Sequence, residues 1–195
     1  MYYISLAEII RSLIGAWRIF LRDPNGVAFF QNDIPAFWKS FWCALLIFPI
    51  YLLLVWSNAN YPDGAIDDLF RASLFEVTAY TLGWVVWPVL MLLGVKIMER
   101  EKDYWGYIVL YNWSAAPMIL FGLIIAALEF SEALPAAVIV SLSIGFLIWR
   151  LVVHIFIFKM TMQISTAMAL PFVLGDFFVG QIILVIKYNM LVVAP

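Results

Sequence analysis

Five long apolar stretches with almost no charged side chains dominate this sequence, and they decide what the chain can fold into. We place them at about residues 40–57, 73–95, 107–128, 134–158 and 169–190. A helix of roughly 20 apolar residues spans the hydrocarbon core of a bilayer, which is about 30 Å thick. The chain is 66% hydrophobic and 12% charged, whereas a soluble domain is about half apolar and about a quarter charged. We therefore predict an all-α, polytopic integral membrane protein, a bundle of about five transmembrane helices in contact with the lipid bilayer.

The first segment, from about residue 4 to residue 22, has the pattern of an amphipathic interfacial helix. At about 100° per residue, one side gathers Leu6, Ile9, Ile10, Leu13, Ile14, Trp17, Phe20 and Leu21, with Ile4 and Ile19 as exceptions. The other side gathers Glu8, Arg11, Ser12, Gly15, Arg18 and Arg22. Arginine opposite tryptophan and phenylalanine suits the plane of the membrane interface, where Leu13, Trp17 and Phe20 would be the membrane-interface residues. The alternative is a helix packed flat on the protein's own spans.

A turn and an aromatic arm connect this helix to the first span. Asp23-Pro24-Asn25-Gly26 is a turn sequence, because proline fixes φ and Asn-Gly tolerates positive φ. Residues 27–38 then form a short arm. We divide the chain into the interfacial helix and arm, residues 1–38, and the five-helix transmembrane domain, residues 39–195.

Basic and acidic connecting segments alternate along the chain, which predicts its orientation. The N-terminal arm and the loop after the second span are basic, whereas the loops after the first and third spans are acidic. The basic set is Arg11, Arg18, Arg22, Lys39, Lys96, Arg100 and Lys102; the acidic set is Asp63, Asp67, Asp68, Glu129 and Glu132. Since basic residues mark the cytoplasmic side, we expect a cytoplasmic N-terminus and a C-terminus on the far side.

A group of polar residues falls inside the predicted spans, where ionisable residues are costly and usually face the bundle interior or a cavity. Arg150 and His154 are four residues apart, so they share one face of the fourth span. Asp176, early in the fifth span, should lie at a similar depth. We predict an Arg150–Asp176 ion pair with His154 close by, and Asn112 and Ser114 at the same level.

Two explanations of this cluster remain open. The polar residues hold neighbouring helices in register, or they line a cytoplasm-facing pocket for an ion, a proton or a lipid headgroup. Further along the fifth span, we expect Gln181 to be a structural polar residue bonded to a neighbouring helix, and Lys187 to reach the far interface. Glu76, early in the second span, is expected to be solvated near the outer surface.

The sequence lacks the motifs of phosphate-binding loops and of nucleophilic or zinc-dependent hydrolases. His154 is the only histidine and Cys43 the only cysteine, which excludes a Cys/His metal site and a disulfide framework. The net charge is −2, with no basic stripe that would bind nucleic acid. We expect no enzymatic activity, no metal and no cofactor.

Residues 107–120 read YIVLYNWSAAPMIL: an aromatic turn, a small-Ala-Pro step and a Leu/Ile-rich run. This segment, the five-span count and the short loops resemble the bacterial branch of the YIP-type (Ypt/Rab-interacting protein) membrane domain, over roughly residues 25–190. The resemblance implies a membrane-organising or trafficking-type role in a bacterial inner membrane, with no catalytic residues. The acidic-Leu-Tyr-Gly-Pro motif of the eukaryotic branch is absent, which counts against a GTPase partner.

Two functions follow from these observations. The first is a non-catalytic scaffold or accessory subunit that binds other membrane proteins, itself or lipids. The second is a small transporter or channel, for which Asn112, Arg150, His154 and Asp176 would be the binding residues. Prolines within the first three spans (Pro49, Pro88 and Pro117) indicate bent helices. A lipid-modifying enzyme is disfavoured by the missing motifs.

Overall fold

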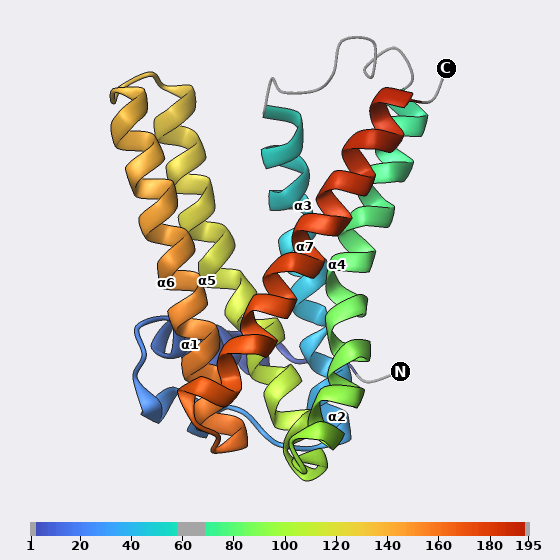
Figure 1. The fold of residues 1–195 in the computed structure, drawn as a ribbon, viewed down its shortest axis with the longest axis vertical. Helices are drawn as coiled ribbons and strands as arrows, with labels where there is room; N and C mark the ends of the chain where they lie inside the picture. Colours follow the sequence, from blue (N-terminus) through green and yellow to red (C-terminus); the bar gives the residue numbers. More distant parts are fainter. Residues whose placement is uncertain (1–2, 58–68, 194–195) are drawn as a thin grey trace.

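A computed structural model describes residues 3–57 and 69–193, and its regular elements are helices (Figure 1). They are α1 (Leu6–Phe20), α2 (Ile34–Ser40), α3 (Trp42–Ser57), α4 (Leu69–Ile97), α5 (Tyr104–Phe130), α6 (Ala136–Met162) and α7 (Thr166–Val193), with the 3-10 helices η1 (Pro24–Phe29) and η2 (Glu101–Asp103). Within the described residues, five helical spans are long and apolar enough to cross a membrane. The prediction of a polytopic helical bundle is confirmed. The predicted acidic loop with Asp63, Asp67 and Asp68 lies outside the described residues.

Helices α4, α5 and α7 extend beyond the apolar stretches that marked them. The fifth span, expected to begin at about residue 169, begins at Thr166 and carries Pro171 inside the helix. The first span includes α2 and runs over Ile34–Leu53. Hydropathy marks only the part of a helix in hydrocarbon, whereas the helix continues to its cap. For α2 this cap is Asp33, whose Oδ1 accepts the backbone N–H of Ala36 at 2.7 Å.

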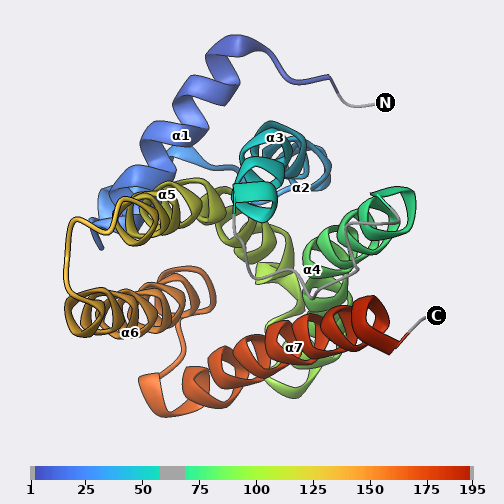
Figure 2. The ribbon, with the colours of Figure 1, turned by 90° about the horizontal axis from the view of Figure 1, so that it is seen from above.

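Helix α5 is the centre of the bundle and packs on α1, α2, α3, α4 and α6 (Figure 2). The first half of α5 forms the core, with Tyr107, Ile108 and Trp113 almost fully buried. Beyond Pro117 its residues are mostly half-buried or exposed. In Figure 1 the α5–α6 pair diverges from α4 and α7 toward this end. The molecule is therefore tightly packed at one end and open at the other.

Helix α1 lies crosswise at the tightly packed end, against α5 (Figures 1 and 2). A capping box begins it: Ser5 Oγ accepts the Glu8 N–H at 3.2 Å, and the Glu8 carboxylate accepts the Ser5 N–H at 2.8 Å. The helix crosses η1 closely at Gly15, where a Cβ would lie 2.6 Å from Cβ of Phe29. Only glycine allows this approach of the two segments.

Helix α1 has a buried and an exposed apolar face. Its buried residues are Gly15, Ala16, Ile19 and Phe20; its exposed large apolar residues are Leu6, Ile10, Leu13, Ile14 and Trp17, with Leu21 just beyond its end. Phe20 is 3% exposed and its ring lies 4.7 Å from that of Phe121. The expectation that Phe20 is a membrane-interface residue is therefore wrong: it belongs to the core. Leu13 and Trp17, each 41% exposed, remain on the outer face.

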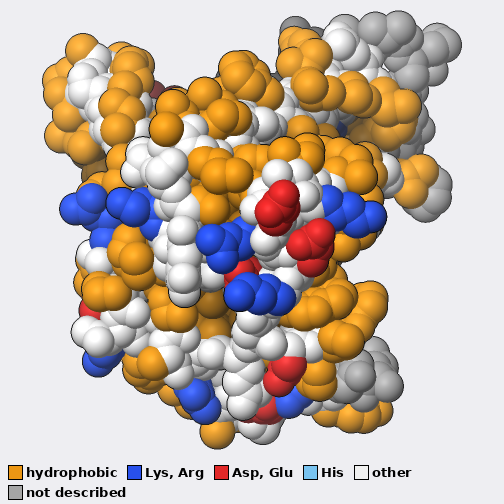
Figure 3. Space-filling view, turned by 60° about the horizontal axis from the view of Figure 1, so that its bottom comes forward, with side chains coloured by type: hydrophobic (Ala, Val, Ile, Leu, Met, Phe, Trp, Pro, Cys, Tyr) orange, Lys and Arg blue, Asp and Glu red, His pale blue; other side chains and the backbone are white. Residues whose placement is uncertain are grey.

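The arginines of this segment contact the protein itself. Arg11 donates to the carbonyl oxygen of Ala28 at 3.2 Å. The guanidinium groups of Arg18 and Arg22 lie 5.2 Å and 5.3 Å from the ring centres of Phe29 and Trp149. Charged side chains gather at this end of the molecule (Figure 3). Its exposed basic residues are Arg11, Arg18, Arg22, Lys96, Lys102 and Lys159.

Candidate functional site

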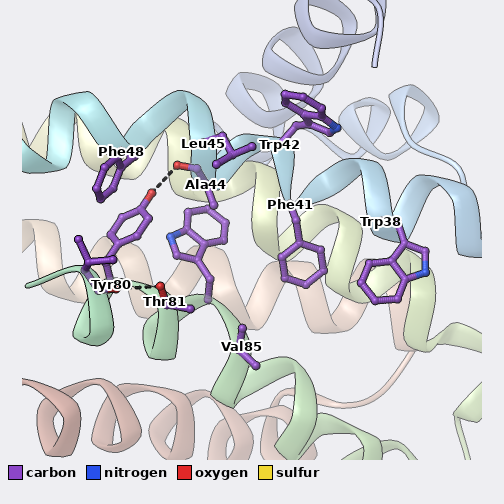
Figure 4. Close-up of a pocket in the computed structure, with 11 residues that line it drawn as sticks. Trp38, Phe41, Trp42, Ala44, Leu45, Phe48, Tyr80, Thr81 and Val85 are labelled. Atoms are coloured by element: carbon purple, nitrogen blue, oxygen red, sulfur yellow. Dashed lines mark hydrogen bonds between the residues drawn. The ribbon is translucent and has the colours of Figure 1, made fainter. Parts of the chain in front are cut away.

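A groove rich in aromatic side chains lies between α2–α3 and α4 (Figure 4). Its volume is about 690 Å³. The α2–α3 side contributes Trp38, Phe41, Trp42, Ala44, Leu45 and Phe48, and α4 contributes Val77, Tyr80, Thr81, Trp84 and Val85. We call this surface the aromatic groove.

The hydroxyl groups of the aromatic groove are already bonded. Tyr80 donates to the carbonyl oxygen of Ala44 at 2.5 Å and so joins α4 to α3 (Figure 4). Thr81 donates to the carbonyl oxygen of Val77 in its own helix at 2.8 Å. Rings and aliphatic groups therefore make up the accessible wall, which suits an apolar occupant.

A second space, the central cavity, lies among α3, α4, α5, α6 and α7 and has a volume of about 460 Å³. Its wall is largely apolar, but it carries the polar residues Tyr51, Tyr80, Tyr111, Ser114, Arg150, His154 and Lys187. An adjoining space of about 210 Å³ shares Tyr111, Arg150 and His154 and adds Asp176 and Gln181.

One polar cluster at these cavities joins α5, α6 and α7. Asp176 Oδ1 accepts the hydroxyl of Tyr111 at 2.7 Å, and Asp176 Oδ2 lies 3.2 Å from Nδ1 of His154. The His154 and Asp176 side chains are mostly buried. The predicted Arg150–Asp176 ion pair is wrong, because within the described residues Asp176 pairs with His154 and not with Arg150.

A second polar cluster joins α3, α4 and α7. Lys187 Nζ lies 3.0 Å from Glu76 Oε1 and 3.2 Å from Glu76 Oε2, and Tyr51 donates to Oε2 at 2.5 Å. Glu76 is 1% exposed, so the expectation of a solvated Glu76 is wrong. Lys187 contacts this carboxylate instead of reaching the far interface. The sequence held a signal that we missed: both residues lie three positions inside the outer end of their predicted spans.

Arg150 is the charged residue of the cavity wall without a carboxylate partner among the described residues. It lines both spaces and its side chain is exposed. It lies one helical turn from His154, closer to the middle of α6.

Asn112 is not at the central cavity. Its Nδ2 donates to Ser40 Oγ at 2.8 Å, which joins α5 to α2, and its Oδ1 is buried without a hydrogen-bond partner. The expectation that Asn112 belongs with Arg150, His154 and Asp176 is therefore wrong, because its side chain faces α2. Ser114 does line the cavity. Gln181 is exposed at the smaller space, and the expected bond from Gln181 to a neighbouring helix is not formed within the described part of the chain.

Among the described residues, no group of three His, Cys, Asp or Glu side chains could hold a metal ion. Cys43 is a buried free thiol inside the first span. The carboxylates that could act as ligands are held singly, each by a tyrosine and a basic residue.

Comparison with known proteins gives one match. The model of the Yip1 domain matches residues 17–186, a range that contains the aromatic groove and every polar residue of the two clusters except Lys187. Searches of curated proteins and of solved structures found no match.

Proposed function

The chain belongs to the Yip1 domain family, and from that premise we propose that it is a non-catalytic scaffold or accessory subunit that binds other membrane proteins or lipids. The Yip1 family is a family of membrane proteins without enzymatic activity, which supports the non-catalytic part of the proposal. The five spans give the chain its contact with the bilayer.

The aromatic groove is the observation that carries this proposal. Tryptophan, tyrosine and phenylalanine are enriched in the cores of protein–protein interfaces, and side chains of these three types form most of this wall. Because Tyr80 and Thr81 already donate their hydroxyl hydrogens within the protein, the groove offers no hydroxyl donor to a polar ligand. The occupant that fits is an apolar segment of a partner membrane protein, whose side chains would fill the space between α3 and α4.

A matched pair of substitutions on α4 tests the groove. Val85 lines it, whereas Val89, one turn further along, does not. Both side chains are exposed, so Val85→Trp and Val89→Trp should both fold. The protein is extracted with its native lipid, and the retained proteins are quantified by mass spectrometry.

We expect a defined partner at near-stoichiometric level with the unchanged chain and with Val89→Trp, and its loss with Val85→Trp. Equal retention by all three proteins would remove the groove from the proposal. Retention of lipid alone, displaced by Val85→Trp, would assign the groove to lipid and leave the chain a lipid-binding protein.

The central cavity favours a second candidate function, a small transporter or channel. Charged residues within spans often mark ion or proton pathways, and Arg150, His154 and Asp176 line the two adjoining spaces. If the protein is a transporter or channel, Asp176→Asn should abolish the flux of ions or protons across vesicle membranes while the fold persists. A structural role predicts lower stability and no flux in any variant.

We further propose a bacterial inner membrane, with the N-terminus cytoplasmic and the C-terminus on the far side. Helix α1 and the C-terminal end of α7 lie toward opposite ends of the bundle (Figure 1). The basic residues around α1 and η2 gather at the end near the N-terminus, and a basic end is typical of the cytoplasmic side.

A further inference from the structure

Among the charged residues around the central cavity, Arg150 is the cation for which the described residues provide no carboxylate. Asp176 is engaged by Tyr111 and His154, and Glu76 by Tyr51 and Lys187. Within the described residues, no carboxylate remains for Arg150. A guanidinium carries five donors and no acceptor, so the group that completes this site must accept hydrogen bonds and carry negative charge.

The depth of Arg150 makes this requirement stronger. It is the fifteenth residue of the 27-residue helix α6, which runs from Ala136 to Met162. Its Cα is therefore roughly 20 Å from either end of the helix, at about 1.5 Å per residue. A charge at this depth is costly in hydrocarbon unless it is paired or hydrated.

Three glycines give the cavity its room. Gly83 on α4, Gly122 on α5 and Gly180 on α7 all line it. A Cβ added at any of them would meet no other atom within 4 Å. The glycines therefore do not serve close helix contact here. They leave free volume in the cavity that Arg150 also lines.

The rest of the wall is apolar, with Met118, Ile119, Phe146, Ile183 and Leu184 among its residues. A small hydrated anion would have to give up its water against this wall. We propose that the central cavity binds an anionic amphiphile, whose phosphate or carboxylate accepts hydrogen bonds from Arg150 and whose hydrocarbon chain lies along the apolar wall. This inference rests on the proposed role in binding membrane components and names a ligand class for a different site from the aromatic groove.

Native mass spectrometry of the purified full chain tests the proposal. The probes are phosphatidylglycerol and phosphatidylcholine with identical acyl chains, so that only the headgroup charge differs. Arg150→Gln removes the charge and Arg150→Lys keeps it. Gly122→Leu fills the cavity, and Gly145→Leu is its control, because Gly145 also has open space around it but does not line the cavity.

We expect one phosphatidylglycerol molecule retained in preference to phosphatidylcholine by the unchanged chain, by Arg150→Lys and by Gly145→Leu. Arg150→Gln and Gly122→Leu should weaken its binding at least about tenfold, which is about 1.4 kcal/mol. Thermal unfolding of each variant checks that the fold persists.

Three results would overturn the proposal: equal retention of both lipids, unchanged retention by Arg150→Gln and Gly122→Leu, or binding of inorganic phosphate alone with displacement of the lipid. Val85→Trp in the aromatic groove should leave phosphatidylglycerol binding intact. The experiments therefore distinguish a failure of the proposal for the aromatic groove from a failure of the proposal for the central cavity.

Discussion

Glu76 carries a carboxylate into the membrane-spanning part of the chain, and Lys187 provides its cation. We predict that Lys187→Met lowers the free energy of unfolding by about 3 kcal/mol, because it leaves a charge at 1% exposure without its ion pair. Glu76→Gln should cost less, since Lys187 is 17% exposed and its long side chain can turn toward water. Reversible unfolding in mixed micelles measures both changes.

The double variant Glu76→Gln/Lys187→Met is the control. It should recover most of the loss caused by Lys187→Met, because no unpaired charge remains. A double variant no more stable than Lys187→Met would show that the ion pair is not the source of the effect.

Glu8 joins α1 to Lys39 of α2, and this contact makes the stability of the fold depend on pH. Its hydrogen bonds with the Lys39 ammonium and with the backbone N–H of Ser5 lower the pKa of the Glu8 carboxyl from 4.5 to about 2. Because the folded pKa lies below the unfolded value, the carboxylate stabilises the fold above about pH 4.5, and this is lost as the pH falls toward 2. The Tm difference between the unchanged chain and Glu8→Gln should therefore shrink between pH 6 and pH 3. A difference that stays constant over this range would contradict the link.

The sequence predicted which polar residues lie at one depth better than it predicted their partners. His154 and Asp176 do meet, because their depths follow from residue counts along two antiparallel spans. The pairing of Arg150 with Asp176 was wrong because charge alone cannot choose between two bases on one helix face. Tyr111 was missed, since a neutral hydroxyl gives no hydropathy signal.

Helix α1 depends on the absence of a side chain at Gly15. We predict that Gly15→Ala separates α1 from η1, because the new Cβ would lie 2.6 Å from Phe29 and 2.7 Å from the ring of Phe30. Overpacking of this kind costs about 1–3 kcal/mol. Limited trypsin digestion should then cleave sooner after Arg18, whose guanidinium lies over the Phe29 ring.

Gly145→Ala is the matched control for this change. It also adds one methyl group to a helix, but nothing lies within 4 Å of the added atom. Its trypsin pattern should equal that of the unchanged chain. Equal cleavage of both variants would show that the close approach at Gly15 does not hold α1 in place.

A helical wheel could predict that α1 exists and has an apolar side, but not that it has two apolar faces. The wheel placed Phe20 with Leu13 and Trp17, whereas the structure buries Phe20 and exposes the other two. The boundary between these faces depends on where α5 and α6 lie. This information is tertiary and has no periodicity in the sequence.

The orientation of the whole molecule can be tested with single thiols. Cys43 is the only cysteine and is 0% exposed, so an introduced cysteine is the reactive one. Lys102 and Glu132 are exposed and lie at opposite ends of α5. We expect Glu132→Cys to react with an impermeant maleimide on intact cells, and Lys102→Cys only after permeabilisation. The reverse pattern would invert the proposed orientation.

The number of spans follows from the sequence because bilayer thickness fixes the length of each apolar stretch. The divergence of the α5–α6 pair from α4 and α7 does not follow. A glycine within a span favours close helix contact as readily as free space, and Gly83, Gly122 and Gly180 turn out to face free space. The cavities were therefore beyond what hydropathy and spacing could predict.

Both polar clusters depend on α7, which contributes Asp176 to one and Lys187 to the other. Helix α7 also leaves the ribosome after α3, α4, α5 and α6. Until α7 is inserted, the ion pair of Glu76 with Lys187 and the contact of His154 with Asp176 cannot form. The two clusters are therefore completed together when α7 is inserted, and a chain that stops before α7 lacks Asp176 of one cluster and Lys187 of the other.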